Sequence, residues 1–319
     1  MVLQVENLQT HLHLKRGVLR AVDGVSLTVG EGETLGLVGE SGSGKTLTGL
    51  SLLRLLPKGS GRIVAGSIKL DGQELTGLSE HAMAHDIRGR RIAMIMQDPM
   101  TSLNPVFSIG DQVGNPLRNH KIVPGAQLRG AVVDVLRRVR LPSADHRLGD
   151  YPHQFSGGQR QRIVAAMAIG CTPRLLVADE PTTALDVTIQ VQIISLLRQI
   201  QADTGAGIIL ITHDLGVAAS LCRRIMVMYA GQIVETGPVR RIYKQPSHPY
   251  TQALLAAIPR LGDKRTRLQA IPGQPPSLID PPTGCRFAAR CSARMDKCAE
   301  APPTVSLADG HSAACWKLV

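Results

Sequence analysis

The sequence predicts an α/β domain with a helical insertion, followed by a small irregular unit at the C-terminal end. Up to about residue 240, short apolar runs alternate with amphipathic stretches, which is the pattern of an α/β domain. Beyond that point the composition shifts, because 10 of the 20 prolines and four of the six cysteines fall within residues 245–319. A chain of 319 residues that is 43% hydrophobic is long enough for one large domain and an appendage.

The composition argues against a disordered chain and against a membrane-spanning one. The longest stretch without Asp, Glu, Lys or Arg has 15 residues, 245–259, and contains three prolines, whereas a spanning helix needs about 20 apolar residues. The first residues, Met1 to Glu6, contain no basic segment followed by an apolar one, so no signal peptide is expected. These features predict a chain that stays in the cytoplasm.

The net charge of +11 and the pI of about 9.8 raise the question of a nucleic-acid partner. Only eight aromatic residues (3 Phe, 4 Tyr and 1 Trp) are present, too few for a base-stacking surface. The basic residues occur in small scattered clusters, at 88–91, 137–140 and 264–267. We therefore expect no nucleic-acid partner; a polyphosphate ligand or an anionic membrane surface explains the charge equally well.

Four short apolar runs have the length and composition of buried strands. They are Thr34–Val38, Ile92–Met96, Leu175–Ala178 and Ile208–Ile211. Amphipathic spacing predicts helices over Leu47–Leu56 and Asp186–Gln201.

A glycine-rich connection, Gly59–Gly66, and a helical block from Ser108 to about Arg147 interrupt this pattern. We expect a helical subdomain at about residues 100–165, inserted between the first and the later core strands. The proline-rich tail cannot continue regular helices. The predicted boundary therefore separates residues 1–240 from a smaller unit of residues 241–319.

A glycine-rich segment follows the first predicted strand and opens the first helix. Its residues are Gly39, Glu40, Ser41, Gly42, Ser43, Gly44, Lys45 and Thr46. They fit every position of the phosphate-binding loop G-x-x-x-x-G-K-[ST]. The glycines let backbone N–H groups turn toward phosphate oxygens, Lys45 supplies charge to the β- and γ-phosphates, and the Thr46 hydroxyl binds Mg²⁺.

Two further segments suit a nucleotide site. The strand predicted at 175–178 ends in Asp179 and Glu180; beside a phosphate loop, Asp179 would join the Mg²⁺ shell and Glu180 would polarise an attacking water. The segment Ser156, Gly157, Gly158 and Gln159 precedes a predicted helix, where a hydroxyl and unobstructed N–H groups form a second anion-binding device. Two such devices predict a phosphate held from two sides.

Together these motifs resemble the nucleotide-binding subunit of an ABC transporter over residues 2–240. The matching segments are, in order, Gly39–Thr46, Gln97, Ser156–Gln159, Asp179–Glu180, Ala184–Asp186 and His213. The resemblance implies a P-loop NTPase core of the ABC type with an active site. It also implies that two such domains stack head to tail, with ATP and Mg²⁺ between one domain's phosphate loop and the other's Ser-Gly-Gly segment.

The resemblance further implies roles for three separate residues. Gln97 contacts Mg²⁺ and the attacking water, Asp186 lies at the dimer seam, and His213 senses the γ-phosphate. Where the family places an aromatic ring against adenine, this sequence has Leu12 between two histidines. Base–aromatic stacking contributes about 1–3 kcal/mol, so adenine is expected to bind more weakly or against a neighbouring histidine. The alternative is that Leu12 is an ordinary core residue.

Four cysteines lie within 31 residues of the tail, at Cys285, Cys291, Cys298 and Cys315. Four thiolates can enclose Zn²⁺ or an iron–sulfur cluster, and disulfides are disfavoured in a reducing cytoplasm. The spacing matches neither the usual zinc pairs nor ferredoxin runs and leaves both open. The other two, Cys171 and Cys222, stand singly in apolar helical surroundings and are expected to be buried.

The tail resembles the C-terminal extension of ATPases from dipeptide and oligopeptide importers. The segments that carry this resemblance are His248–Leu255, Gly284–Phe287, Arg290–Cys291, Gln97–Pro105 and Ala178–Thr188. Members of that group with four such cysteines are implied to bind a [4Fe–4S] cluster, which we favour over Zn²⁺.

The resemblance implies an energy-coupling ATPase at the cytoplasmic face of a bacterial inner membrane. The implied partners are a second, non-identical ABC ATPase subunit, two transmembrane permease subunits and, indirectly, an extracytoplasmic substrate-binding protein. Di- and oligopeptides are the favoured cargo, and nickel, glutathione or another small solute is the alternative. A soluble ABC ATPase acting on ribosomes or DNA is a weaker alternative, because such proteins usually carry two nucleotide domains or a long coiled coil. A P-loop kinase is a third alternative, but the Ser156–Gln159 segment is not a feature of such kinases.

Overall fold

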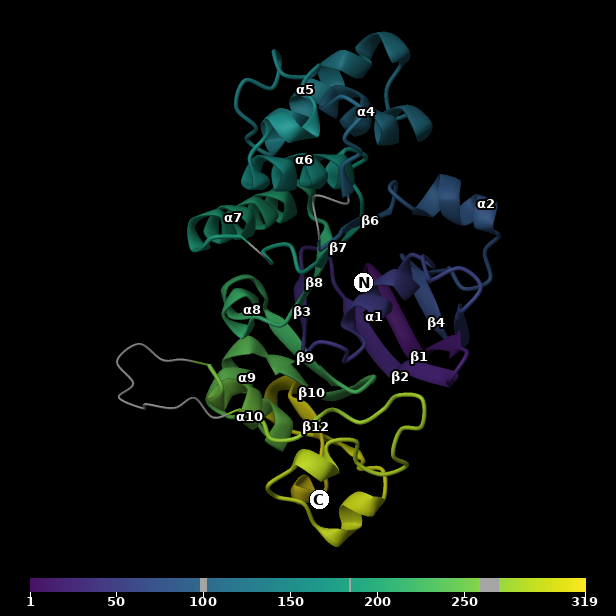
Figure 1. Cartoon of the computed structure of the whole chain (residues 1–319), viewed down its shortest axis with the longest axis vertical. Coiled ribbons are helices and arrows are strands. Elements are labelled where there is room, and N and C mark those ends of the chain that lie inside the picture. Colours follow the sequence, from purple (N-terminus) through teal and green to yellow (C-terminus); the bar gives the residue numbers. More distant parts are fainter. Residues whose placement is uncertain (98–101, 184, 259–269) are drawn as a thin grey trace. The chain divides into compact units, whose positions relative to one another are not determined.

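The computed structural model describes residues 1–97, 102–183, 185–258 and 270–319 (Figure 1). The chain divides into two units, each assembled from separate stretches of sequence. Unit 1 consists of Met1–Leu3, Thr28–Thr34 and Lys69–Ile211, and unit 2 of Gln4–Leu27, Leu35–Ile68 and Thr212–Val319.

Three parallel strands form the sheet of unit 1. They are β6 (Ile92–Ile95), β7 (Leu175–Asp179) and β8 (Gly207–Thr212), of which only the last residue belongs to unit 2. β7 pairs with β6 on one side and with β8 on the other. Every residue of β7 and β8 is buried, as expected for parallel strands covered on both faces. The strands predicted over these three segments are confirmed.

Four helices follow the predicted pattern in unit 1. They are α4 (Ile109–Asn119), α5 (Leu128–Arg138), α6 (Gly157–Ile169) and α7 (Val187–Thr204). The first three pack on one another, which confirms a helical block after Ser108. Asp186 caps α7 and Gly205, at φ +66°, ends it, because glycine adopts the left-handed conformation without a Cβ clash. This unit also contains the short elements α2 (Glu80–Ala82) and β5 (Gln73–Glu74).

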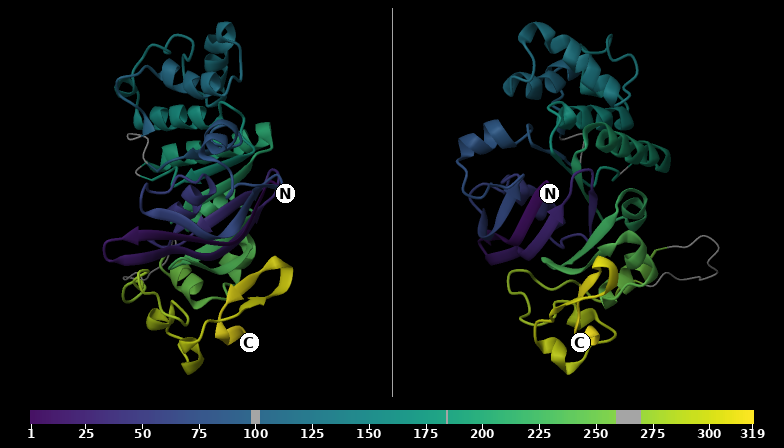
Figure 2. Two further views of the ribbon diagram at one scale, coloured as in Figure 1. Left: turned by 90° about the vertical axis from the view of Figure 1, so that its right-hand side faces the viewer. Right: turned by 180° about the vertical axis from the view of Figure 1, so that it is seen from behind.

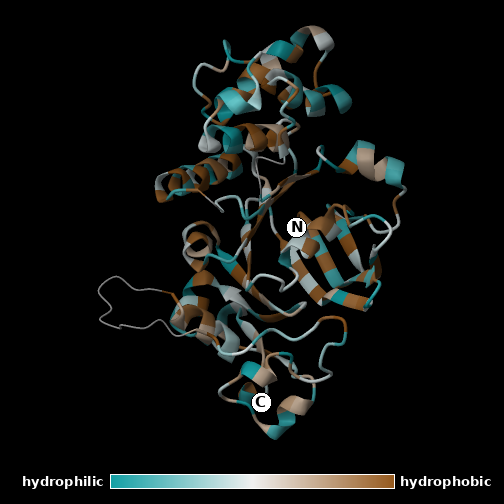
Figure 3. Cartoon of the chain, viewed as in Figure 1, coloured by the Kyte–Doolittle hydropathy of each residue, from teal (hydrophilic) through white to brown (hydrophobic). Residues whose placement is uncertain are grey.

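Hydropathy colouring shows α7 brown along much of its length (Figure 3). Its inner residues Ile193, Leu197 and Ile200 are buried, whereas Val187 and Val191 are 76% and 60% exposed. Exposed aliphatic side chains next to the Asp186 cap give this end of the helix an apolar surface.

Unit 2 contains most of two sheets. Strands β1 (Leu3–Leu14), β2 (Gly17–Val29) and β4 (Gly61–Leu70) form one, in the order β2-β1-β4. In the other, β3 (Thr34–Val38) pairs in parallel with β9 (Arg224–Tyr229), and β9 pairs antiparallel with β10 (Gln232–Pro238). The helices of this unit are α1 (Lys45–Leu52), α8 (Leu215–Leu221), α9 (Val239–Lys244) and α10 (Pro249–Ala256).

The C-terminal tail joins this second sheet. Strand β12 (Ser312–Ala314) pairs with β10, and β11 (Thr304–Ser306) pairs with β12. Figure 2 shows the two short strands in yellow at the end of the chain. The rest of the described tail after α10 consists of turns and single-turn helices, as its prolines predict. Within the described parts of the chain, no helix combines the length and the hydropathy that crossing a membrane requires.

Two local predictions are wrong. The segment Gly59–Gly66, expected as a loop, contains the first half of β4. Gly66 adopts φ +98°, and a Cβ there would lie 2.6 Å from the Cα of Leu8, so this glycine allows a close strand contact. The first helix begins at Lys45 and ends at Leu52, before Leu56, because Arg54 turns the chain with φ +53°.

Candidate nucleotide site and cysteine cluster

The glycine-rich loop lies between β3 and α1 of unit 2, where the sequence predicts it. Gly42 and Gly44 have φ values of +78° and +106°, which side chains with a Cβ rarely adopt. Lys45 is 5% exposed, and its Nζ donates hydrogen bonds of 2.8 and 2.9 Å to the carbonyl oxygens of Gly39 and Glu40. The ammonium group therefore lies folded against the loop that is expected to hold phosphate.

Two features of this loop fit a phosphate ligand. Among the residues that the structure describes, no side chain caps the N-terminus of α1, and its first turn contains no acidic residue, so the positive end of this helix favours an anion such as phosphate. The Ser43 hydroxyl is buried and, among the described residues, has no hydrogen-bond partner. A buried hydroxyl without a partner is costly, and a phosphate oxygen would satisfy it. Ser41 and Thr46 are exposed.

The acidic pair lies at the end of β7 in unit 1. Asp179 is 3% exposed. Glu180 has φ +46°, and its carboxylate accepts hydrogen bonds from Thr183 Oγ1 at 2.7 Å and Gln97 Nε2 at 3.2 Å. The structure thus joins Gln97 and Glu180, which sequence reasoning proposed separately. Thr183 was not among the predicted site residues; its position three residues after Glu180 was the available signal.

The Ser-Gly-Gly segment forms the N-terminus of α6, also in unit 1. Ser156 caps the helix: its hydroxyl accepts from the Gln159 N–H at 3.4 Å, and the Gln159 side chain accepts from the Ser156 N–H at 3.1 Å. Ser156 and Gly157 are exposed, and a Cβ on Gly157 would meet no atom within 4 Å. In Gly158 the corresponding position lies 3.0 Å from Ile189. The segment is therefore an exposed helix start with open space beside its backbone.

The remaining predicted residues lie at element ends. Asp186 is exposed and accepts a 2.9 Å hydrogen bond from the Ile189 N–H as the cap of α7. His213 is exposed directly after β8. Unit 2 therefore holds the phosphate loop and His213, and unit 1 holds Gln97, the Ser156 segment, the acidic pair and Asp186. The expected Ala184 lies outside the described residues.

The four tail cysteines line one small cavity in unit 2, together with Phe287 and Trp316. All four are free thiols and half-buried. Burial raises the pKa of Cys285 and of Cys291, and in each the neighbouring thiols raise it further. Among the residues described, no three His, Cys, Asp or Glu side chains are arranged as metal ligands. The structure gathers the thiols around one space without placing them in coordination geometry.

The two isolated cysteines are buried, as predicted. Burial raises the pKa of Cys171 to about 11 and that of Cys222 to about 12. Both thiols therefore stay protonated and pack as small apolar side chains.

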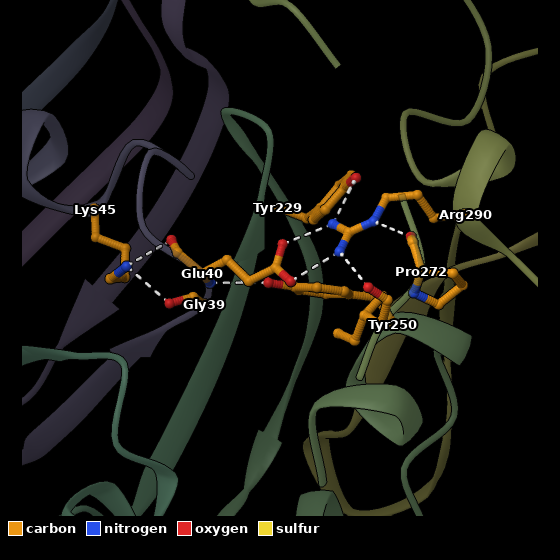
Figure 4. Close-up of polar contacts among 8 residues, drawn as sticks. Gly39, Glu40, Lys45, Tyr229, Tyr250, Pro272 and Arg290 are labelled. Carbon is orange, nitrogen blue, oxygen red and sulfur yellow. Dashed lines mark hydrogen bonds and ion pairs between the residues drawn. The ribbon is translucent and has the colours of Figure 1, made fainter. Parts of the chain in front are cut away.

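Two tail residues contact the phosphate loop. Arg290 forms an ion pair with Glu40, and the Tyr250 hydroxyl accepts a hydrogen bond from the Glu40 N–H (Figure 4). Both residues belong to the tail motifs His248–Leu255 and Arg290–Cys291, but the sequence indicates no role for either. Their sequence separation from Glu40 carries no local signal.

Comparison with known proteins agrees with these features. Residues 22–183 match the family model "ABC transporter", and residues 234–298 match "Oligopeptide/dipeptide transporter, C-terminal region". The "Putative peptide import ATP-binding protein BOV_A0348" of Brucella ovis is 48% identical, covering 98% of this chain and 96% of that protein. The "Probable peptide ABC transporter ATP-binding protein y4tR" of Sinorhizobium fredii is also 48% identical, covering 99% of this chain and 95% of that protein.

Solved structures agree on the fold. The ABC transporter protein cbiO1 of Clostridium perfringens has a TM-score of 0.66 at 25% identity, covering 76% of this chain and 91% of that one. The ATP-binding cassette MJ0796, solved as a dimer bound to ADP and phosphate, has a TM-score of 0.65 at 24% identity, covering 75% of this chain and 99% of that one. This chain belongs to the ABC transporter family of ATP-binding proteins and carries the C-terminal region found in oligopeptide/dipeptide transporters.

Proposed function

We propose that this chain is the ATP-hydrolysing subunit of a bacterial ABC importer for di- or oligopeptides, bound at the cytoplasmic face of the inner membrane. The observation that carries the proposal is the match over nearly the whole chain to peptide import ATP-binding proteins. The phosphate loop, the Ser156 helix start and the carboxylate of Glu180 supply the parts that ATP hydrolysis needs.

The chemistry proposed is phosphoryl transfer from ATP to water. Glu180, oriented by Thr183 and Gln97, acts as general base toward the attacking water. Lys45 leaves the carbonyl groups of its own loop to bind the β- and γ-phosphates, and His213 contacts the γ-phosphate. Thr46, Asp179 and Gln97 would hold Mg²⁺, which neutralises charge on the phosphate oxygens.

The proposed assembly is composite. Ser156 and Gly157 of a second, related ATPase subunit complete the site around ATP, and Asp186 lies at the seam. Val187 and Val191, beside Asp186, are exposed in this chain. Their apolar side chains support the proposal that a second subunit packs against that end of α7. Closure of the dimer on ATP would drive two permease subunits to accept cargo from an extracytoplasmic substrate-binding protein.

Purification from membranes in mild detergent tests the proposal. We expect the full-length chain to co-purify with two membrane-spanning proteins and a second ATPase. Its ATP hydrolysis should rise when a peptide-loaded substrate-binding protein is added. Stimulation by nickel or glutathione instead would reassign the cargo. Recovery of the chain bound to ribosomes or DNA, with no membrane protein, would contradict the proposal.

We also propose that Cys285, Cys291, Cys298 and Cys315 bind a [4Fe–4S] cluster rather than Zn²⁺. The fit rests on the donor set, since four thiols line one cavity and, in the part of the chain that the structure describes, form no disulfide. When bound, such a cluster would cross-link turns of the tail that share little regular structure.

Anaerobic purification is the test of this site. We expect iron and sulfide in equal amounts with visible absorbance, and loss of both in Cys298→Ser. The Cys171→Ser variant changes a buried thiol outside the cavity and should keep the iron. Zinc without sulfide in the wild-type chain would contradict the cluster.

A further inference from the structure

The C-terminal tail contacts the phosphate loop at Glu40. Arg290 donates two parallel hydrogen bonds to its carboxylate, from Nη1 to Oε2 at 2.7 Å and from Nη2 to Oε1 at 3.0 Å. The Tyr250 hydroxyl accepts from the Glu40 N–H at 2.9 Å. The carbonyl oxygen of Glu40 accepts from Lys45. The backbone N–H, the backbone carbonyl and the carboxylate of Glu40 are therefore all held by hydrogen bonds (Figure 4).

The arginine itself is held rigidly. Its side chain is 5% exposed, and its remaining N–H groups donate to the carbonyl oxygens of Pro272 at 2.9 Å and Ile271 at 3.4 Å. Its Nη1 also lies 3.3 Å from the Tyr229 hydroxyl. All N–H donors of the Arg290 guanidinium thus have acceptors. A bidentate pair of this kind holds the Glu40 carboxylate in one orientation and also neutralises its charge.

The tyrosine is held by an aromatic cluster. Tyr250 is 0% exposed, and its ring lies 4.5 Å from that of Tyr229 and 5.3 Å from that of Phe287, measured between centroids. Burial raises the pKa of the Tyr250 phenol, so the hydroxyl stays neutral. The cluster spans β9, α10 and the segment just before Arg290, all within unit 2.

We propose that Arg290 and Tyr250 are positioning residues of the nucleotide site, through which the C-terminal tail sets the affinity of the phosphate loop for ATP. The inference rests on the proposed function of residues 39–46 as the ATP-binding loop. The contacts of Arg290 and Tyr250 with Glu40 act in two ways: they order the phosphate loop, and they neutralise its carboxylate.

Ordering comes first. A glycine-rich loop loses backbone freedom when it closes on a ligand. Contacts that fix the Glu40 peptide and side chain before ATP arrives reduce that cost. The Tyr250 hydroxyl also accepts a hydrogen bond from the backbone N–H of Glu40. This contact holds the Glu40 peptide group in one orientation.

Charge is the second effect. Glu40 brings a carboxylate into the loop that binds a triphosphate, and an unpaired carboxylate there would repel the ligand. The guanidinium of Arg290 neutralises it at 2.7 Å. Removing the arginine alone should therefore harm ATP binding more than removing both charges.

The test measures equilibrium binding of ATP to the full-length chain. In Arg290→Met we expect about tenfold weaker binding than in wild type. Glu40→Gln is measured alone as the reference, and the double variant Glu40→Gln/Arg290→Met, which has no unpaired carboxylate, should bind ATP more tightly than Arg290→Met. The control is Arg294→Met, an exposed arginine in the same segment, which should bind ATP like wild type.

A structural role alone would weaken binding equally whether Glu40 is charged or not. Rescue by Glu40→Gln is therefore the supporting result, and additive losses in the double variant would overturn the inference. If Arg290→Met does not fold, Tyr250→Phe serves as the second variant, with about threefold to tenfold weaker binding expected and unchanged affinity counting against the proposal. Failure of the wild-type chain to bind ATP would instead overturn the proposed function itself.

Discussion

Glu180→Gln should lower ATP hydrolysis by at least about 100-fold while ATP still binds, since a positioned general base contributes about 10²–10⁴ in rate. The amide keeps an oxygen that accepts the Thr183 hydrogen bond and has nearly the shape of the carboxylate. It cannot take a proton from water. Phosphate release from the purified complex and equilibrium binding of ATP measure the two effects separately.

Glu31→Gln is the matched control for this prediction. It removes the same charge in unit 1 from an exposed ion pair with Arg174, and such pairs contribute about 1 kcal/mol or less. Its hydrolysis rate should equal that of the wild type. Hydrolysis by Glu180→Gln at more than a tenth of the wild-type rate would remove Glu180 from the role of base.

Gly44→Ala should abolish ATP binding by displacing the phosphate loop. Gly44 has φ +106°, and a Cβ would lie 2.2 Å from the carbonyl oxygen of Ala21 and 2.7 Å from the Met228 methyl group. The carbonyl belongs to the backbone and cannot rotate away, so the loop must move. We expect ATP affinity to fall more than about 100-fold and the free energy of unfolding to fall by about 1–3 kcal/mol, measured by ATP titration and chemical denaturation.

Gly32→Ala separates the clash from backbone strain. Gly32 also has positive φ, +59°, but a Cβ there would meet no atom within 4 Å. This variant should lose about 1–2 kcal/mol of stability from the left-handed conformation and keep its affinity for ATP. Equal loss of ATP binding in both variants would contradict the assignment of the effect to the loop.

Local sequence signals predicted most of the core. The strands β3, β6, β7 and β8 consist almost entirely of apolar residues, as is typical of strands in a parallel sheet covered on both faces. Ser156, predicted at a helix N-terminus, caps α6 by accepting from an N–H group three residues away. Contacts of this kind can be predicted because both partners are close in the sequence.

Misses arose where the determining contact is distant in sequence. Gly66 belongs to a strand because the backbone of β1 passes beside it, which its glycine-rich neighbours do not reveal. Arg290 and Glu40 are 250 residues apart, so the pair depends on the folded tail. The sequence grouped the four cysteines as ligands of one site, and the structure places them around one cavity. The spacing did not identify the ligand, because zinc and iron–sulfur clusters both accept thiolates.

Peptide uptake into vesicles tests the central claim most directly: ATP hydrolysis at this chain's site drives import. Vesicles carrying the whole complex, with ATP on the side of the nucleotide-binding subunits, should accumulate labelled peptide only when the substrate-binding protein is present. A complex with Glu180→Gln in this chain should accumulate less than a tenth as much. Undiminished uptake by that complex, or accumulation without ATP, would contradict the account.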